Sequence, residues 1–431
     1  MTYAVTAAFV VYFCMYAFRK PFSAATFDGG YDLGDGRVFA FKTLFVVSQL
    51  VGYALSKYAG IRVCSEARRS QRLPLLLGLI VVAELALVGF GAAPSSQPLL
   101  KPLAIFANGL PLGMVWGLVV LYLEGRRTSE ILLTGLSCSY IVASGVVKDV
   151  GRALLAGAWI PVPLLPAEQG WAIPNPLPPV PEFWMPAATG ALFLVPFALA
   201  AWLLDQTPEP DREDEAARTP RGPMLRAERY AFLRQYGLAI GLAIAAYFLL
   251  TAFRDYRDNY MVEVLTQLSY DYENNRSMIT RSELLVAFGV MAVLSQLHRI
   301  RDNRAGLIAT YAVMSVGLLS VGLATLLLDL GVLTGFWWIT AVGMGAYLAY
   351  VPFGSVLFDR SIAQTRFAGT AVFGIYLADA VGYTGSVAIQ LTKDLGTAGV
   401  SQLDFLRMLA YAVGLLGSAL LVGSCYAFAR R

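Results

Sequence analysis

Charged residues are scarce in this sequence of 431 residues, and histidine occurs once. Asp, Glu, Lys and Arg make up 14 % of the chain, whereas a soluble domain carries about a quarter. Hydrophobic residues account for 57 %, and the mean hydropathy is +0.60. Because so few charges cannot solvate the surface of a soluble fold, the composition indicates a protein that crosses a membrane many times.

Cysteine is also rare, and its four positions form no recognisable site. Cys14, Cys64, Cys138 and Cys425 are far apart, lack C-x-x-C spacing and lie mostly inside apolar runs. This spacing argues against a disulfide framework and against a zinc site. The sequence also lacks G-x-S-x-G, H-E-x-x-H and phosphate-loop motifs. We therefore expect no enzymatic activity and no metal ion or other cofactor.

Long apolar runs, in contrast, are abundant. A membrane-spanning helix needs about 20 mostly apolar residues, and twelve segments meet this requirement. Their approximate bounds are 3–25, 38–58, 73–93, 101–123, 131–160, 183–204, 236–262, 281–298, 305–328, 332–358, 363–392 and 402–428. The first segment lacks a cationic n-region and an A-x-A-like cleavage site, so we expect it to be retained as a helix. The sequence thus predicts an all-α membrane protein with twelve transmembrane helices.

Lys and Arg gather in alternate loops between these segments. The even-numbered loops and the C-terminal tail hold them, for example at Arg68, Arg126, Arg218, Arg299, Arg366 and Arg430. The odd-numbered loops are poor in cations, and residues 161–182 contain none. Because cytoplasmic loops are enriched in Lys and Arg, both termini are predicted to be cytoplasmic. We expect a monomeric multi-pass protein of the bacterial inner (plasma) membrane, in contact with the lipid bilayer and with no nucleic acid partner.

One long hydrophilic stretch divides the chain into two halves. Residues 206–235 carry mixed charges and several prolines, which is typical of a linker. We therefore predict an N-terminal six-helix bundle over 1–205, a cytoplasmic linker over 206–235 and a C-terminal six-helix bundle over 236–431. The proline-rich segment 161–182 is interpreted as an extracytoplasmic loop. A rigid spacer and a lid are the two alternatives for its role.

A short motif of the first segment recurs 235 residues later in the seventh. Tyr, Phe, Ala, Phe and Arg stand at equivalent positions in 12–19 and 247–254, and the two motifs end in Arg19 and Arg254. Parallel six-helix repeats, related about an axis along the membrane normal, are typical of one large transporter architecture with its substrate site between the halves. The sequence therefore predicts two pseudo-symmetric bundles with both arginines near a central site.

Arg19 and Arg254 are unusual residues to find inside apolar segments. A buried cation costs about 2.5–3.5 kcal/mol on insertion scales, so two of them at equivalent positions require compensation. An arginine fork matches phosphate with two parallel hydrogen bonds, which makes a bound anion one explanation. Snorkelling of both side chains to the outer interface is the other. Because the outer side is otherwise poor in cations, we favour anion binding.

Over its whole length the chain resembles a transporter of the major facilitator superfamily. Within that superfamily, the run from Arg19 through Lys20 to Ser23, at the end of a Tyr-containing first helix, is similar to the organophosphate:phosphate antiporters, which include the sugar-phosphate exchangers. This resemblance implies that Arg19 and Arg254 bind phosphate and that Lys20 is a neighbouring cation. Two features depart from the family. The loop after the second helix lacks the aspartate of its Asp-Arg pair, and the fifth helix has no histidine.

Other charged residues are candidates for the same site. In the fifth helix, Lys148 and Asp149 are expected to form a pair that lines the cavity. Lys20 is expected to pair with Asp255 or another acid, and Asp255 to belong to an ion-pair network that keeps the empty site neutral. Asp379, isolated among apolar residues, is interpreted as the counter-ion of a cavity arginine, with a proton site as the alternative.

Three tyrosines complete the candidate site. Tyr16, Tyr140 and Tyr376 are expected to orient a phosphate or a sugar hydroxyl. Together these residues predict transport of a small organic anion by alternating access, as the exchange of a phosphorylated metabolite for phosphate. A proton-coupled carboxylate or anion symporter, with Asp149 or Asp379 as the proton carrier, stays open as an alternative. So does a membrane anion sensor that does not transport.

Overall fold

The computed structural model describes residues 2–32, 38–94, 96–97, 99–123, 126, 129–158, 160–161, 172–173, 178–209, 226–270, 277–300, 302–358, 360–361, 371–396 and 399–430. In these residues the chain forms an all-α membrane protein with twelve membrane-crossing segments in two bundles of six, as the sequence predicts. Ten segments are long and apolar enough to cross a membrane by length and composition alone. The other two are α2 (Phe41–Glu66) and α13 (Ala371–Gly396), which carry internal charges such as Lys57 and Asp379.

The N-terminal bundle consists of six helices and short connections. Its helices are α1 (Thr2–Arg19), α2, α3 (Arg69–Ala92), α4 (Leu100–Leu123), α5 (Ser129–Ala156) and α6 (Met185–Asp205). A 3-10 turn, η1 (Pro21–Ala24), follows α1 because Pro21 cannot continue the α-helical hydrogen bonds. Two antiparallel pairs connect helices, β1 (Gly30–Asp32) with β2 (Val38–Ala40) and β3 (Ile160–Pro161) with β4 (Ala172–Ile173).

The C-terminal bundle repeats this arrangement. Its helices are α8 (Arg226–Gln267), α9 (Met278–Leu297), α10 (Asn303–Asp329), α11 (Gly335–Ser355), α13 and a last crossing made of α14 (Gln402–Ala412), η3 (Val413–Gly417) and α15 (Ser418–Ala429). Helix α8 begins at Arg226, so the last part of the 206–235 segment is helical. The same helix bends at Tyr260, where φ and ψ are −115° and 15°.

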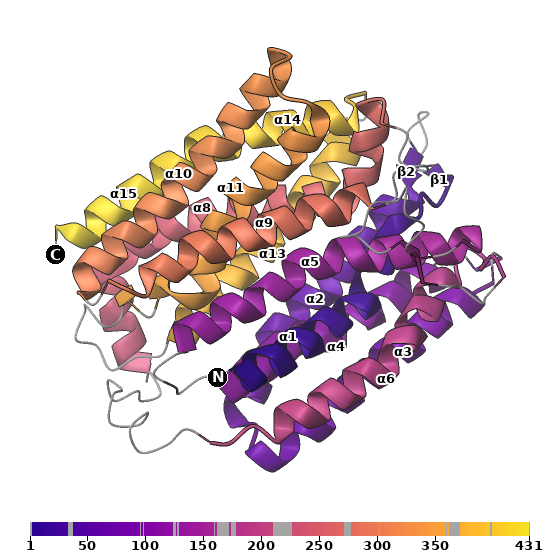
Figure 1. Ribbon diagram of the computed structural model, residues 1–431, viewed down its shortest axis with the longest axis horizontal. Coiled ribbons are helices and arrows are strands. Elements are labelled where there is room, and N and C mark those ends of the chain that lie inside the picture. Colours follow the sequence, from indigo (N-terminus) through magenta and orange to yellow (C-terminus); the bar gives the residue numbers. More distant parts are fainter. Residues whose placement is uncertain are drawn as a thin grey trace.

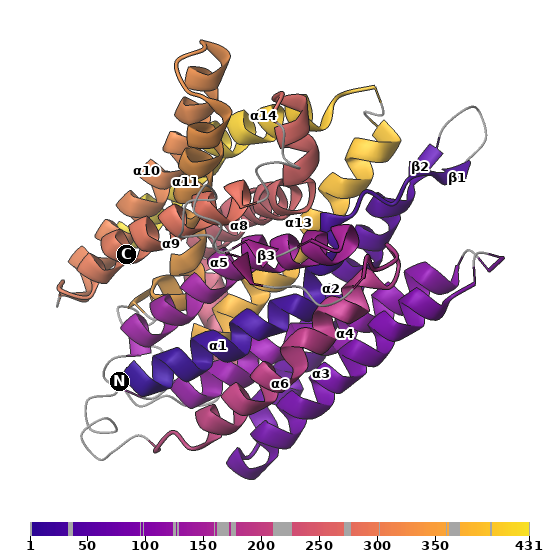
Figure 2. The same cartoon turned by 45° about the vertical axis from the view of Figure 1, so that its right-hand side comes forward.

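The helices lie side by side, and the two ends of the molecule can be told apart by what they carry (Figure 1). The N- and C-termini lie at one end, which we call the termini side. The β1–β2 hairpin lies at the opposite end, the hairpin side, and both views agree on this placement (Figure 2). Helix α1 therefore runs from the termini side to Arg19, toward the hairpin side.

The two bundles contact each other along two helix pairs, α2 with α13 and α5 with α9. Tyr53 of α2 lies against Tyr383 of α13, with ring centroids 4.8 Å apart. A Cβ atom on Gly145 of α5 would lie 2.8 Å from the Cα of Thr280 in α9, so only glycine permits this approach. Val286 of α9 belongs to the same buried hydrophobic cluster as the N-terminal bundle. The central site thus lies between bundles that touch on both flanks.

Candidate functional site

A small cavity lies between the two bundles. Its volume is about 30 Å³, which leaves room for one or two water molecules. Helices of both bundles contribute the residues that line it, namely Tyr12, Tyr16, Tyr53, Lys57, Trp116, Tyr140, Tyr247, Arg254, Tyr350, Gly354, Ile375, Asp379 and Tyr383. Seven of these residues are tyrosines, so hydroxyl groups and ring faces dominate the wall. A substrate of more than a few atoms therefore requires the side chains or the bundles to move apart.

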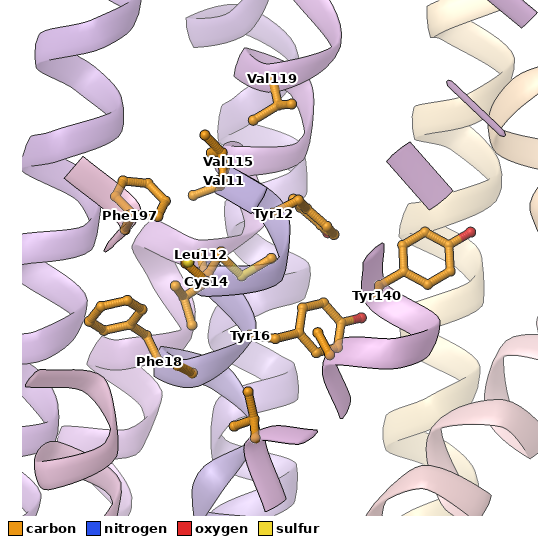
Figure 3. Packing of buried hydrophobic residues seen from close by; sticks show 14 of the residues in the cluster. Val11, Tyr12, Cys14, Tyr16, Phe18, Leu112, Val115, Val119, Tyr140 and Phe197 are labelled. Atoms are coloured by element: carbon orange, nitrogen blue, oxygen red, sulfur yellow. The ribbon is translucent and has the colours of Figure 1, made fainter. Parts of the chain in front are cut away.

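The aromatic wall is continuous from one bundle to the other. The ring centroids of Tyr12 and Trp116 are 4.9 Å apart, and those of Trp116 and Tyr140 are 5.8 Å apart. Figure 3 shows Tyr12 and Tyr16 on the flank of α1 that faces Tyr140. Tyr140 then meets Tyr350 of α11 at 6.0 Å. Two of the three tyrosines expected at the site, Tyr16 and Tyr140, are therefore part of the cavity wall.

Among the described residues, Arg254 is one of two cations that line the cavity. Its Cζ lies 4.1 Å from the centroid of the Tyr350 ring, and Nη2 donates to the Asp255 carboxylate at 2.6 Å. The second oxygen of Asp255 accepts a hydrogen bond of 2.8 Å from Ser386 in α13. Asp255 thus forms an ion pair with Arg254, while Nε of Arg254 is buried without a hydrogen-bond partner.

Arg19 lies behind the tyrosines and is not among the described residues that line the cavity. Its Cζ is 4.0 Å from the centroid of the Tyr53 ring and 5.7 Å from that of Tyr383. The side chain is 2 % exposed, and its Nε and Nη2 have no hydrogen-bond partner. The helix end is fixed by Gln49, whose amide donates to the Arg19 carbonyl at 3.0 Å. The two motif arginines thus occupy unequal environments.

Lys57 is the second cation in the cavity wall, and sequence reasoning missed it. It forms an ion pair of 2.9 Å with Asp379, whose other oxygen accepts a 2.7 Å hydrogen bond from the Tyr247 hydroxyl. Asp379 was expected to be the counter-ion of an arginine, and its partner is this lysine instead. The available signal was the spacing: Lys57 follows Tyr53 by four residues, which places both on one face of α2.

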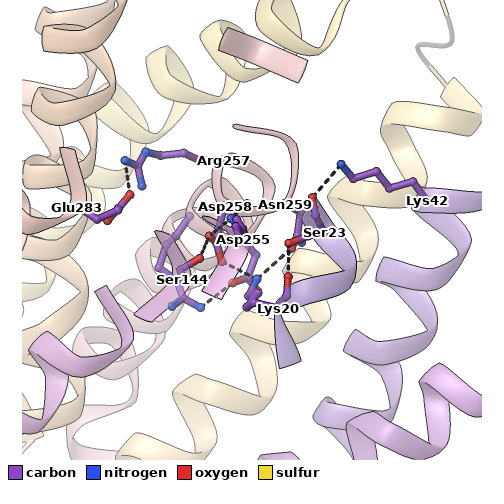
Figure 4. Close-up of polar contacts among 11 residues, drawn as sticks. Lys20, Ser23, Lys42, Ser144, Asp255, Arg257, Asp258, Asn259 and Glu283 are labelled. Atoms are coloured by element: carbon purple, nitrogen blue, oxygen red, sulfur yellow. Dashed lines mark hydrogen bonds and ion pairs between the residues drawn. The ribbon is translucent and has the colours of Figure 1, made fainter. Parts of the chain in front are cut away.

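A polar network joins the bundles between this cavity and the hairpin side (Figure 4). Two lysines of the N-terminal bundle form ion pairs with Asp258 of α8. They are Lys20, directly after α1, and Lys148 of α5, whose Nζ atoms lie 2.5 and 2.6 Å from the carboxylate oxygens. Ser144 also donates to Asp258, and Lys20 donates to the Asn259 side chain at 2.9 Å. The sequence predicts Asp255 or another acid as the partner of Lys20. The partner is Asp258, which lies three residues, about one helical turn, closer to the end of α8.

Asp149 and Lys42 extend these contacts. Asp149 accepts a hydrogen bond from Thr280 of α9, whereas the neighbouring Lys148 turns to Asp258. Adjacent residues point about 100° apart around a helix, so the expected Lys148–Asp149 pair is replaced by two separate contacts with the other bundle. Closer to the hairpin side, Lys42 pairs with Glu263 and donates to the Ser23 carbonyl at 3.2 Å.

Tyr376 lies away from the other expected site residues. Its hydroxyl is buried beside Cys64 and Gly117, on the termini side of Asp379, and has no hydrogen-bond partner. It is not among the described residues lining the cavity, although Ile375 is. The described residues also contain no group of three or more His, Cys, Asp or Glu that could hold a metal ion.

The chain matches one family model and is similar to solved structures. A family model described as "Family of unknown function (DUF5690)" matches residues 21–178 and 176–431. No curated protein matches the sequence. Among solved structures, a D-xylose–proton symporter is similar over 97 % of this chain and 96 % of its own, with a TM-score of 0.62 and 12 % identity.

A second similar structure is a bacterial homologue of the human lysosomal transporter Spinster, in an inward-facing and unoccupied conformation. The similarity covers all of this chain and 98 % of the other, with a TM-score of 0.61 and 13 % identity. At such low identities the likeness shows the fold, which is the twelve-helix, two-bundle fold of the major facilitator superfamily.

Proposed function

The chain belongs to the DUF5690 family, whose function is unknown, and we propose that it transports a small organic anion across the membrane by alternating access. The transport that we propose in detail is the exchange of a phosphorylated metabolite for phosphate. Both structurally similar proteins are named as transporters, and transport requires a site that each side of the membrane can reach in turn. The cavity between two bundles supports this role.

The observation that carries the proposal is the surplus of buried positive charge around the cavity. Five buried cations lie in the cavity wall or in the contacts beside it, Arg19, Lys20, Lys57, Lys148 and Arg254, against the four carboxylates Asp149, Asp255, Asp258 and Asp379. One positive charge is left over. An isolated buried charge is costly, and a bound anion would compensate it. Arg19, which lies behind Tyr53 and has two buried nitrogens without partners, becomes a donor group for such an anion when the bundles move apart.

The same surplus gives a reason for exchange. A site with uncompensated positive charge is costly to enclose between apolar helices, whereas an anion bound within it restores neutrality. The anion therefore binds the closed state more tightly than the open one and lowers the free energy of reorientation. An empty carrier would reorient slowly, and a loaded carrier quickly, in both directions. Obligatory exchange of one anion for another follows from this difference.

Exchange can be measured with purified protein in liposomes loaded with phosphate. We expect uptake of radiolabelled phosphate against internal phosphate, and loss of that uptake to background in Arg19→Gln and Arg254→Gln. Arg19→Lys keeps the charge but removes the planar fork, so it should retain only part of the activity. Arg407→Gln is the matched control, because Arg407 is partly exposed and pairs with Asp329 far from the cavity. Unchanged exchange in both glutamine variants would remove the arginines from the mechanism.

Proton-coupled symport of an anion is the second candidate, favoured by the carboxylate in the cavity wall. Asp379 lines the cavity and accepts a hydrogen bond from Tyr247, so it is placed to take up a proton together with a substrate. In this case a pH gradient would drive net uptake, and Asp379→Asn would abolish that uptake while leaving exchange intact. If a pH gradient has no effect on uptake by the wild-type protein, exchange is the better description.

A further inference from the structure

Lys57 is placed to contact whatever occupies the cavity. It comes from α2 of the N-terminal bundle, its side chain is 3 % exposed, and it lines the cavity with Arg254 of the opposite bundle. Lys57 and Arg254 are the only cations among the described residues lining the cavity. Lys20 and Lys148 contact Asp258 on the hairpin side, and Arg19 lies behind Tyr53. An anion that enters the cavity therefore meets one cation from each bundle.

The carboxylate partners of these two cations are held in different ways. Asp255 follows Arg254 in the chain and is fixed by Ser386. Asp379 reaches Lys57 across the bundle interface, and it has a second partner on its own bundle, the Tyr247 hydroxyl. When Lys57 turns to another anion, Asp379 keeps its hydrogen bond with Tyr247. The pair can thus be opened without leaving the carboxylate entirely unpaired.

We propose that Lys57 is a substrate ligand that selects dianions over monoanions, with Asp379 holding its ammonium group until the substrate arrives. This inference rests on the proposed function, because it assumes that an anion binds in the cavity. A dianion shares its two charges between Arg254 and Lys57, whereas a monoanion satisfies only one of them. Phosphate monoesters at neutral to basic pH are dianions of this kind.

Two small probes of the same shape separate charge from size. Methyl phosphate is a dianion at pH 8, because its second pKa is about 6, and methyl sulfate is a monoanion. Titration calorimetry of the purified protein in detergent gives the ratio of their dissociation constants. Because hydrogen bonds to a charged group are among the stronger ones, we expect wild-type protein to prefer methyl phosphate by about tenfold or more.

The decisive variant is the double substitution Lys57→Gln/Asp379→Asn, which removes the pair without changing the net charge of the site. We expect it to bind both probes with similar affinity. The matched control is Lys42→Gln/Glu263→Gln, which removes another interbundle pair that lies outside the described cavity wall. It should keep the wild-type preference. A preference that survives in the Lys57 variant would mean that the overall charge selects dianions, and it would overturn the role of Lys57.

A single substitution tests the role of Asp379 without removing the lysine. In Asp379→Asn the competing carboxylate is gone while Lys57 stays, so we expect methyl phosphate to bind several-fold more tightly than to wild type. If the pair is only structural, the affinity falls or stays the same, and the inference is wrong. Wild-type protein that binds neither phosphate nor methyl phosphate would instead contradict the proposed function itself, which keeps the two failures apart.

Discussion

Asp258 holds polar contacts with three residues of the opposite bundle. Lys20 and Lys148, both from the N-terminal bundle, form ion pairs with this one carboxylate, and Ser144 donates a hydrogen bond to it. The two lysine side chains are 4 % and 1 % exposed. Breaking a buried pair leaves an uncompensated charge, which costs more than the pair contributes by itself. Asp258 is therefore the counter-ion that allows two ammonium groups to stay in the interior.

Replacement of this carboxylate should destabilise the fold in a measurable way. We expect Asp258→Asn to lower the free energy of unfolding by about 3 kcal/mol or more, because both lysines lose their charged partner. Thermal and denaturant unfolding of the purified protein in detergent would measure the loss. Asp404→Asn is the control, since its pair with Arg407 is largely exposed and exposed pairs contribute at most about 1 kcal/mol. Equal losses in the two variants would contradict this account of Asp258.

Individual cations could be found from the sequence, but their partners could not. Arg19, Lys20 and Arg254 stand out because each interrupts an apolar run, and that signal is local. The choice between Asp255 and Asp258 as the partner of Lys20 depends on how α1 and α8 are placed against each other, which no local pattern encodes. Lys57 was missed because the expected segment 38–58 puts it at a helix end, whereas α2 continues to Glu66.

At the scale of helices, α5 and α9 lie in close contact on the hairpin side. Gly145 of α5 faces the backbone of Thr280 in α9, where a Cβ atom would lie 2.8 Å from Cα and 3.1 Å from the amide nitrogen. Backbone atoms cannot move aside as the end of a flexible side chain can. Thr280 also donates a hydrogen bond to Asp149, one turn further along α5. A small residue and a polar contact thus together hold these two helices in register.

A large side chain at this position should separate the bundles on the hairpin side. We expect Gly145→Leu to lengthen the distance between spin labels at Val38 and Val332, two exposed positions on that side in different bundles. Double electron–electron resonance measures this distance in a variant whose native cysteines have been replaced. Gly78→Leu is the control, because nothing lies within 4 Å of a Cβ at Gly78. An unchanged distance in Gly145→Leu would show that α9 gives way locally instead.

Helix positions follow from hydropathy more closely than helix ends do. Every expected apolar segment overlaps one membrane-crossing segment of the structure, because about 20 apolar residues have few alternatives in a bilayer. The ends differ where the helix continues past the apolar run. Helix α8 spans Arg226–Gln267 against an expected 236–262, since its polar ends lie outside the apolar crossing. The kink at Tyr260 likewise has no signal in a hydropathy window.

For the molecule as a whole, the contacts between the bundles differ along its long axis. Ion pairs and hydrogen bonds of Lys20, Lys42, Lys148 and Asp149 join them between the cavity and the hairpin side. Toward the termini side, the contact of α2 with α13 continues through the Lys57 pair to the ring of Tyr376 beside Cys64. Alternating access requires the contacts of the hairpin side and those of the termini side to open in turn. Opening of the hairpin side must therefore replace several charged contacts with water or with substrate.

The side of the membrane on which charged contacts close the cavity depends on which way the hairpin side faces. Lys and Arg are concentrated in the loops of the termini side, so we expect that side to be cytoplasmic. Fusions expressed in bacteria test this orientation. A fluorescent protein that folds only in the cytoplasm should fluoresce when attached after Arg431, and alkaline phosphatase attached there should be inactive. A truncation after Gly331, in the turn between α10 and α11 on the hairpin side, should give the reverse pattern with both reporters. The reverse result at both positions would mean that the hairpin side is cytoplasmic. In that case the charged contacts between the bundles close the cytoplasmic entrance, and the substrate that opens them comes from inside the cell.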